Sequence, residues 1–194
     1  MAHRVGPAAI VLALVALQGC ATLAPQRSRE PLPHFFRVDQ GLYRGGQPTP
    51  EGFRQLAQRG IRTVIDLRVE PKTHRKQEQQ LVESLGMRWV SLPMRWYWRP
   101  SDAQVIKFLQ VALDPSQQPV FVHCRKGRNR TGTLVAVYRI VAQSWSPERA
   151  YAEARNLGLS RWNPLTRHII FREAQQEYVP ATASFHRSRL VDSP

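Results

Sequence analysis

The sequence has few cysteines, few acidic residues and no long apolar segment. In 194 residues, 14 Asp and Glu residues stand against 28 Lys and Arg residues, which gives a formal net charge of +14 at pH 7. Two cysteines, Cys20 and Cys124, are too few for a disulfide framework. The longest apolar run, residues 5–17, is shorter than the roughly 20 residues of a membrane-spanning helix. A disulfide-rich scaffold and a polytopic membrane protein are therefore excluded.

The excess of cations, nearly all arginine, is the next feature. Such a charge attracts phosphorylated small molecules, phosphoproteins, acidic lipid surfaces or nucleic acid. It equally fits the codon bias of an arginine-rich organism. The sequence shows no recognition helix and no interleaved aromatic and basic platform, so we expect no nucleic-acid partner. A hydrophobic fraction of 42% and this length fit one soluble globular domain.

The first 19 residues are predicted to be a signal peptide. They hold one early arginine and the apolar run, and the sequence Leu-Gln-Gly before Cys20 resembles a bacterial lipoprotein signal. We expect lipid on Cys20, a tether over residues 20–34, and an exported, membrane-anchored protein that faces the periplasm or the cell exterior. A plain secretory signal is the alternative. If Cys20 is lipidated, Cys124 is the remaining free thiol.

From residue 35 to residue 180 the pattern alternates between strand and helix. Short apolar runs predict strands over residues 61–67, 87–92 and 120–123, and apolar periodicity predicts helices over residues 73–85 and 131–142. N-caps are expected at Thr49, Ser101, Ser146 and Asn163. The alternation predicts an α/β fold with a central, mostly parallel sheet of about four or five strands flanked by helices. Residues 181–194 lack periodicity and are expected to be a disordered tail.

The segment that carries the chemistry, His123 to Gly132, lies between a predicted strand and a predicted helix. Ligands bind at the carboxyl ends of strands in such sheets, and a helix N-terminus suits an anion. Inward-pointing amides of this loop favour the thiolate of Cys124 and lower its pKa. Arg130, six residues later, can hold two phosphate oxygens with its planar guanidinium. The segment therefore predicts a nucleophile at the base of a phosphate-binding cup.

The sequence His-Cys-x5-Arg-Thr-Gly that starts at His123 resembles the signature of the cysteine-dependent protein tyrosine phosphatase superfamily. The segments 42–48 and 60–68 resemble those of atypical dual-specificity phosphatases of bacteria, plants and fungi. This resemblance covers roughly residues 36–155 and implies a tyrosine phosphatase-like fold. It also implies hydrolysis of phosphate monoesters through a phosphocysteine, without a metal or an organic cofactor. Phosphorylated proteins or small molecules would be the substrates.

The resemblance also assigns roles to residues of the loop. Cys124 is the implied nucleophile and Arg130 the implied ligand of the phosphate and the transition state. Thr131 is implied to help the thiolate leave, and it can equally cap the following helix. The implied lining of the cup consists of Arg125, Lys126, Gly127, Arg128 and Asn129. We expect His123 to shape the loop by hydrogen bonding rather than to carry a proton.

The general acid of this superfamily is an aspartate on a mobile loop, which corresponds here to residues 93–102. Where many relatives have that aspartate, this chain has Trp96 and Tyr97. Asp102 is our candidate for the acid, although its position also fits a first-turn helix acid. Asp66, at the end of a predicted strand, is a second candidate and can instead pair with an arginine. The aromatic residues 96–98 are expected to wall a pocket, touch lipid or cover the core.

Other functions compete with a phosphotyrosine or dual-specificity phosphatase. The same scaffold can act on inositol polyphosphates or pyrophosphates. A non-catalytic phosphate-binding module would keep the cup and lack the acid. Sulfur transfer and arsenate reduction also use a thiolate in a tight loop, but the chain lacks the second free cysteine of arsenate reductases, and the Arg-Thr-Gly continuation favours phosphate.

Overall fold

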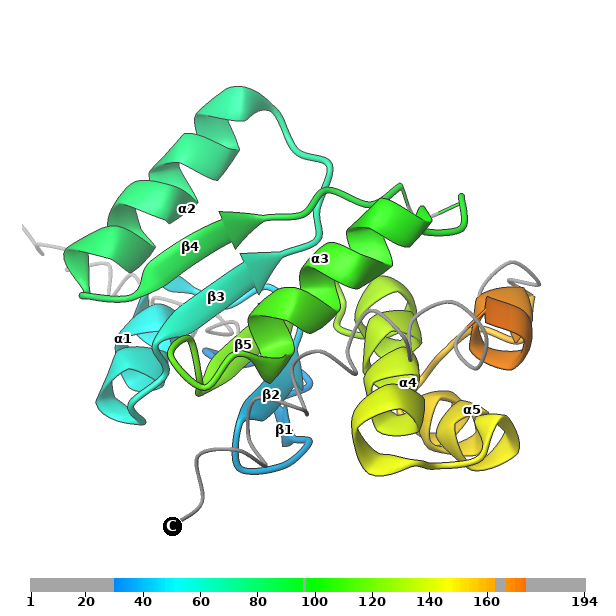
Figure 1. The fold of residues 1–194 in the computed structure, drawn as a ribbon. Helices are drawn as coiled ribbons and strands as arrows, with labels where there is room; N and C mark the ends of the chain where they lie inside the picture. Colours follow the sequence, from blue (N-terminus) through cyan, green and yellow to red (C-terminus); the bar gives the residue numbers. More distant parts are fainter. Residues whose placement is uncertain (1–29, 96, 163–166, 174–194) are drawn as a thin grey trace, which may run out of the picture.

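In a computed structural model of the chain, five strands form one sheet that is covered by helices on both faces (Figure 1). The structure describes residues 30–95, 97–162 and 167–173. In the strand order β1-β2-β5-β3-β4, the neighbours are parallel except for β1, which pairs antiparallel with β2. The predicted α/β fold with a mostly parallel sheet is confirmed.

The strands are short: β1 is Phe36–Arg37, β2 is Leu42–Gly45, β3 is Thr63–Asp66, β4 is Arg88–Ser91 and β5 is Val120–His123. β3 and β5 are buried at every position, as expected for parallel strands that helices cover on both sides. Asp66 is the register partner of His123, so these two strands end at the same edge of the sheet. The strands predicted over 61–67 and 87–92 form over shorter spans.

The helices are α1 Pro50–Gln58, α2 Lys72–Ser84, α3 Asp102–Leu113, α4 Asn129–Gln143 and α5 Pro147–Asn156, followed by a π-helical turn, η1, at Ile169–Glu173. Three predicted N-caps are confirmed, because the side chains of Thr49, Ser101 and Ser146 each accept a hydrogen bond from the first turn. The helix predicted over 131–142 begins two residues earlier, with Arg128 at its N-cap position. Thr131 therefore lies inside α4, and its reading as a helix cap is wrong.

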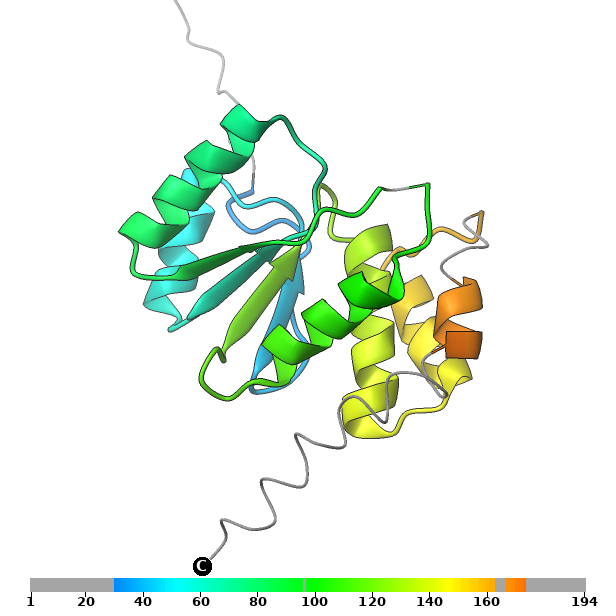
Figure 2. The ribbon, with the colours of Figure 1, turned by 45° about the horizontal axis from the view of Figure 1, so that its top comes forward.

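Helices lie on both faces of the sheet (Figure 2), and a separate cluster of buried hydrophobic side chains joins the helices to each face. On one face, α1 and α2 pack against Val64 of β3 and Phe121 of β5. On the other face, α3, α4 and α5 pack against Ile65 and Val122. Successive residues of a strand point to opposite faces, so each of these two strands contributes to both clusters. Because β3, β4 and β5 run parallel, the loops after their carboxyl ends meet at one edge of the sheet.

Several predicted segments lie outside the described residues. These are the signal peptide, Cys20, the tail over 181–194, Trp96, and the N-cap expected at Asn163. Within the described part of the chain, no helix combines the length and the apolar character that crossing a membrane requires.

Candidate active site

Cys124 opens the loop that joins β5 to α4, at the edge where β3 and β5 end. It is 3% exposed, and it lines a cavity of about 850 Å³. The loops after β3, β4 and β5 supply most of the lining, which is formed by Val69, Glu70, Met94, Arg95, Tyr97, Cys124, Arg125, Lys126, Arg128, Asn129, Arg130, Gly158 and Ser160. The predicted nucleophile thus stands in the wall of a large cavity.

The surroundings of the Cys124 thiol favour its ionised form. Burial raises the pKa of this thiol, but the polar groups around it outweigh burial and hold the pKa below its ordinary value. These groups are the hydroxyl and the backbone N–H of Thr131, the guanidinium of Arg130 and the backbone N–H of Gly127. The Thr131 hydroxyl is buried, and its interaction with the sulfur is one of the causes that lower the pKa of the Cys124 thiol.

The loop keeps its shape because glycine stands at residue 127. Gly127 has a φ of +69°, and a Cβ atom there would lie 2.5 Å from the backbone of Gly45 and Gly46. From β2, the Nη2 atom of Arg44 donates a hydrogen bond to the Gly127 carbonyl at 2.8 Å. The backbone N–H of Gln47 donates to the Arg125 carbonyl at 3.3 Å. The segment 42–48 that carried part of the family resemblance therefore supports the loop from behind.

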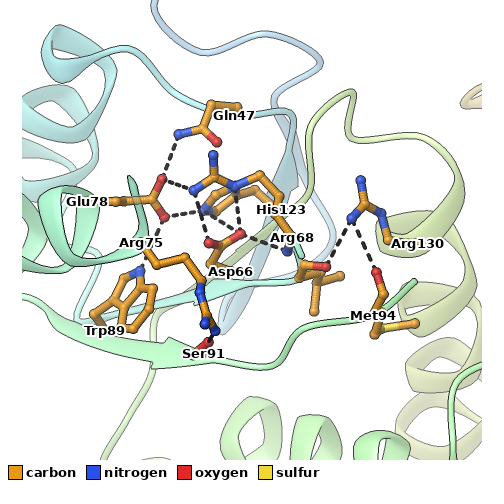
Figure 3. A network of polar contacts seen from close by, with 11 residues as sticks. Gln47, Asp66, Arg68, Arg75, Glu78, Trp89, Ser91, Met94, His123 and Arg130 are labelled. Carbon is orange, nitrogen blue, oxygen red and sulfur yellow. Dashed lines mark hydrogen bonds and ion pairs between the residues drawn. The ribbon is translucent and has the colours of Figure 1, made fainter. Parts of the chain in front are cut away.

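Arg130 stands in the first turn of α4 and reaches across to the neighbouring loops. Its Nη1 atom donates to the carbonyl oxygens of Leu67 at 3.2 Å and Met94 at 3.3 Å (Figure 3). These two bonds hold the guanidinium beside the cavity that it lines, close enough to Cys124 to lower the pKa of the thiol.

Most other residues of the predicted cup form the rim of the cavity. Arg125, Lys126 and Arg128 are exposed, and with Arg95 they surround the opening with positive charge. The guanidinium of Arg128 also contacts the His34 ring, with a shortest distance of 2.9 Å. Asn129 holds the loop differently, because its side-chain oxygen accepts a hydrogen bond from the backbone N–H of Ser160 at 2.9 Å.

A buried network of charged side chains lies beside the loop (Figure 3). Glu78, on α2, accepts hydrogen bonds from Arg68 at 2.6 Å, from Gln47 at 2.6 Å and from Trp89 at 3.2 Å. Its other close partner is His123, with 3.1 Å between the His123 Nε2 and the Glu78 carboxylate. Four segments distant in sequence therefore meet at one carboxylate.

The charges of this network stabilise one another. Burial raises the pKa of Glu78, but His123 and Arg68 outweigh that effect and lower it to about 2. Burial lowers the pKa of His123, but Glu78 and Asp66 outweigh it and raise the pKa above its ordinary value. The loop-shaping role that we predict for His123 thus takes the form of a bond to α2, directly before Cys124 in the chain.

Asp66, Glu78 and His123 are also the types of side chain that bind metals, and their ligand atoms lie within 4.8 Å of one another. The guanidinium of Arg68, however, sits between the two carboxylates, with its Nε 2.8 Å from Asp66 and its Nη2 2.6 Å from Glu78. Arg68 therefore supplies the positive charge that a metal would bring, and the set does not fit a cation site.

The candidates for the general acid lie in different places. Asp66 is fully buried and paired with Arg68, so of its two predicted roles the structure shows the pairing with an arginine. Asp102 is exposed in the first turn of α3 and is not among the residues that line the cavity. Glu70 does line the cavity, and among the described lining residues it is the one carboxylate. Sequence reasoning missed Glu70 because it lies in the loop after β3, where the family's general acid is not expected.

Of the aromatic residues expected to wall a pocket, Tyr97 lines the cavity and Trp98 does not. Tyr97 is 48% exposed, and its hydroxyl accepts a hydrogen bond from Arg95 at 3.1 Å. Trp98 is 62% exposed. Of the two described aromatic residues, Tyr97 therefore forms part of the cavity wall as predicted.

A family model described as "DSP-PTPase phosphatase fused to NAD+ Kinase" matches residues 33–167. The chain belongs to this phosphatase family. The match covers all of the sheet, the loop at Cys124 and helices α1 to α5, and it confirms the resemblance to dual-specificity phosphatases.

The chain is similar to "Inositol diphosphatase DSP3" of Arabidopsis thaliana, with 31% identity over 68% of this chain. It is also similar to "Dual specificity protein phosphatase TpbA" of Pseudomonas aeruginosa, with 29% identity over 73% of this chain. It spans 66% and 65% of the lengths of these two relatives, just under two thirds. The catalytic core of the PP-IP phosphatase SIW14 from S. cerevisiae has the same fold, with a TM-score of 0.71, 23% identity, and coverage of 82% of this chain and 96% of that one.

The lowered pKa of Cys124 gives a first testable expectation. In the full chain, the thiolate absorbance at 240 nm that is lost on Cys124→Ser should titrate with a midpoint below the ordinary pKa of a cysteine thiol, about 8.5. Alkylation of Cys124 by iodoacetamide should follow the same midpoint, because the thiolate is the nucleophile. A midpoint at or above that ordinary value would show that burial outweighs the surrounding donors.

Replacing Glu78 with glutamine should destabilise the fold by about 3 kcal/mol at pH 7, because it leaves buried cations short of a partner. The Glu78 pKa falls from 4.5 to about 2 on folding, so its ionised form stabilises the fold fully above pH 4.5. That stabilisation is lost as the pH falls through about 2, and the difference from the parent chain should shrink over the same range. Urea unfolding at several pH values measures this, and Glu83→Gln, an exposed site on the same helix, is the matched control. Equal effects of the two variants would contradict the role of Glu78.

Proposed function

We propose that this chain hydrolyses phosphate monoesters through a phosphocysteine formed on Cys124. The sulfur attacks phosphorus, and the bond between phosphorus and the leaving oxygen breaks as that oxygen takes up the electron pair and a proton. Water then attacks phosphorus, the sulfur–phosphorus bond breaks with its electrons returning to sulfur, and inorganic phosphate leaves. The observation that carries this proposal is a thiol of lowered pKa in the wall of a cavity bordered by cations.

Each remaining part of the loop has a task in this reaction. Arg130 is held by two carbonyl oxygens beside the cavity, where its guanidinium can bind phosphate oxygens in a bidentate manner. The Thr131 hydroxyl and the Gly127 N–H lie at the sulfur and stabilise its negative charge when the intermediate is hydrolysed. Membership of a phosphatase family supports the same sequence of steps.

In our proposal Glu70 protonates the leaving oxygen. It lines the cavity together with Cys124, whereas Asp102, the candidate named from the sequence, does not. It is half-buried and lies in the loop after β3. Asp102 remains the alternative, to be distinguished by experiment.

The rim of the cavity favours substrates with more than one phosphate group. Four exposed cations, Arg95, Arg125, Lys126 and Arg128, line it with one carboxylate among the described residues. A single phosphate needs the loop and Arg130 alone, so these extra charges suit a second phosphate. Inositol polyphosphates or pyrophosphates are therefore the second candidate class beside phosphotyrosine in proteins. The name of the Arabidopsis relative, an inositol diphosphatase, supports this class, and the name of the Pseudomonas relative supports the first.

The amino-terminal segment carries a proposal of its own. From the sequence before Cys20 we propose an exported lipoprotein, anchored through that cysteine and facing the periplasm or the cell exterior. Metabolic labelling with a fatty acid that persists in the parent chain and in Cys124→Ser, and is lost in Cys20→Ser, is the expected result. Labelling that is absent from the parent chain would contradict it.

The proposed reaction predicts a burst of product. Rapid mixing with an aryl phosphate should release about one equivalent of phenol per chain before the steady state if hydrolysis of the intermediate is slow. The burst and the turnover should both disappear in Cys124→Ser, while phosphate binding persists. A panel of phosphotyrosine peptide, phosphoserine peptide and inositol diphosphate then ranks the substrate classes by kcat/KM. Binding of these ligands without turnover of any of them would instead show a non-catalytic phosphate-binding module.

The acid assignment predicts an effect that depends on the leaving group. Glu70→Gln should lower kcat for an alkyl phosphate by about 10²–10⁴-fold, because such a leaving group must be protonated as it departs. It should change kcat for p-nitrophenyl phosphate much less, since nitrophenolate leaves without a proton. Asp102→Asn is the matched comparison and should leave both rates within about twofold of the parent, since general-acid effects are far larger. The reverse pattern would assign the acid to Asp102.

A further inference from the structure

A second cavity, of about 470 Å³, lies between the amino-terminal strands and the helices α4 and α5. Its charged and aromatic lining consists of Arg37, Arg44, Arg139, Arg149, Glu153, Trp145 and Phe36. It shares no lining residue with the cavity at Cys124. Four arginines against one glutamate make it strongly positive, and none of the four lines the cavity at Cys124, although Arg44 supports the loop there.

Arg44 is the unusual member of this lining. It is 1% exposed, and its Nε and Nη1 atoms are buried without a hydrogen-bond partner in the described structure. Burial lowers the pKa of Arg44 to about 10, which leaves the side chain charged at neutral pH. A buried charge with unpaired N–H groups is costly, and an anion that accepts from them would remove part of that cost.

Among the other charged residues of the cavity, only Arg139 and Glu153 pair with each other within the described structure. Arg139 and Glu153 form a two-bonded pair, with nitrogen–oxygen distances of 3.0 and 2.6 Å, so they cancel. Arg149 lies over the Trp145 ring at 3.7 Å from its centre, and the Nε of Arg37 donates to the Asp39 carbonyl. Neither of these two arginines pairs with a carboxylate among the described residues. With Arg44, three of the four arginines therefore have no carboxylate at hydrogen-bond distance among the described residues, and Glu153, the one acid of the lining, acts on Arg44 from further away.

We propose that this cavity is a binding site for a phosphate group. Phosphate fits better than a carboxylate because it offers more oxygens to planar guanidinium groups and carries up to two negative charges. Arg44 supplies the buried charge, and Arg37 and Arg149 supply exposed charges around it. Inorganic phosphate and phosphate monoesters share this chemistry and are the two sources to be separated.

The site is joined to the loop at Cys124 by a short chain of contacts. The Nη2 atom of Arg44 donates to the Gly127 carbonyl at 2.8 Å, and the N–H of Gly127 acts on the Cys124 sulfur. The guanidinium that would meet the bound phosphate is thus the one that supports the loop. Binding there is expected to raise the thermal midpoint of the chain, because the ligand binds the folded state alone.

The test is a titration observed at Trp145. The full chain with Cys124→Ser and ¹⁵N-labelled tryptophan is titrated with inorganic phosphate and, separately, with phenyl phosphate, and the Trp145 indole resonance is identified by Trp145→Phe. A saturable shift of this resonance with either ligand is expected, and the ligand that binds more tightly identifies the source. Arg37→Glu, which leaves the ring contacts of Trp145 in place, should raise the dissociation constant at least tenfold. Arg62→Glu makes the same charge change at an exposed position that lines neither cavity, and it should leave the constant unchanged.

A Trp145 resonance that moves with neither ligand would overturn the proposal, as would equal weakening by Arg37→Glu and Arg62→Glu. The thermal midpoint of unfolding gives a second test. Phosphate should raise this midpoint less when Arg149→Glu is added to the Cys124→Ser chain than in the Cys124→Ser chain itself. Binding to the loop at Cys124 does not imitate these results, because Arg37 and Arg149 do not line that cavity. A failure of the hydrolysis proposed above leaves this test unaffected.

Discussion

A sulfur atom that is 3% exposed and favours its ionised form places strict demands on the atoms around it. Burial works against the charge, so the backbone must bring hydrogen-bond donors to the sulfur in fixed positions. The fold does this by ending β5 directly before Cys124 and starting α4 five residues later, at Asn129. Gly127 permits the curl between them, and Arg130 adds a positive charge. Sheet, loop and helix are thus arranged around one atom.

The second demand is that the loop keeps its shape. Arg44 holds the Gly127 carbonyl from β2, and Glu78 holds His123 from α2. Both supports are buried charges, which are costly unless paired, and the network around Glu78 pairs nearly all of its members. The loop is therefore supported from outside, by side chains that do not line the cavity at Cys124.

Sequence reasoning found the features that are local in the chain. The loop at Cys124, the strand before it and the cap at Ser101 could all be predicted, because each depends on residues within a few positions of one another. It did not find Arg44 or Glu78, whose partners lie 83 and 45 residues away. It also missed Glu70, which becomes a site residue when the loops after β3 and β5 meet at one cavity. No periodicity or motif encodes such long-range meetings.

The contacts of the first described residues set a geometric limit on the enzyme that we propose. The carbonyls of Pro31 and Pro33 accept hydrogen bonds from the turn after β2, and His34 contacts Arg128 at the rim of the cavity. Pro31 lies eleven positions after Cys20 in the sequence, so the chain between them spans no more than about 40 Å when fully extended. If acyl chains hold Cys20 in a bilayer, this short linking segment keeps the cavity at Cys124 near the lipid headgroups. The enzyme would then bind substrates from the thin layer of solution next to the membrane rather than from the bulk solution.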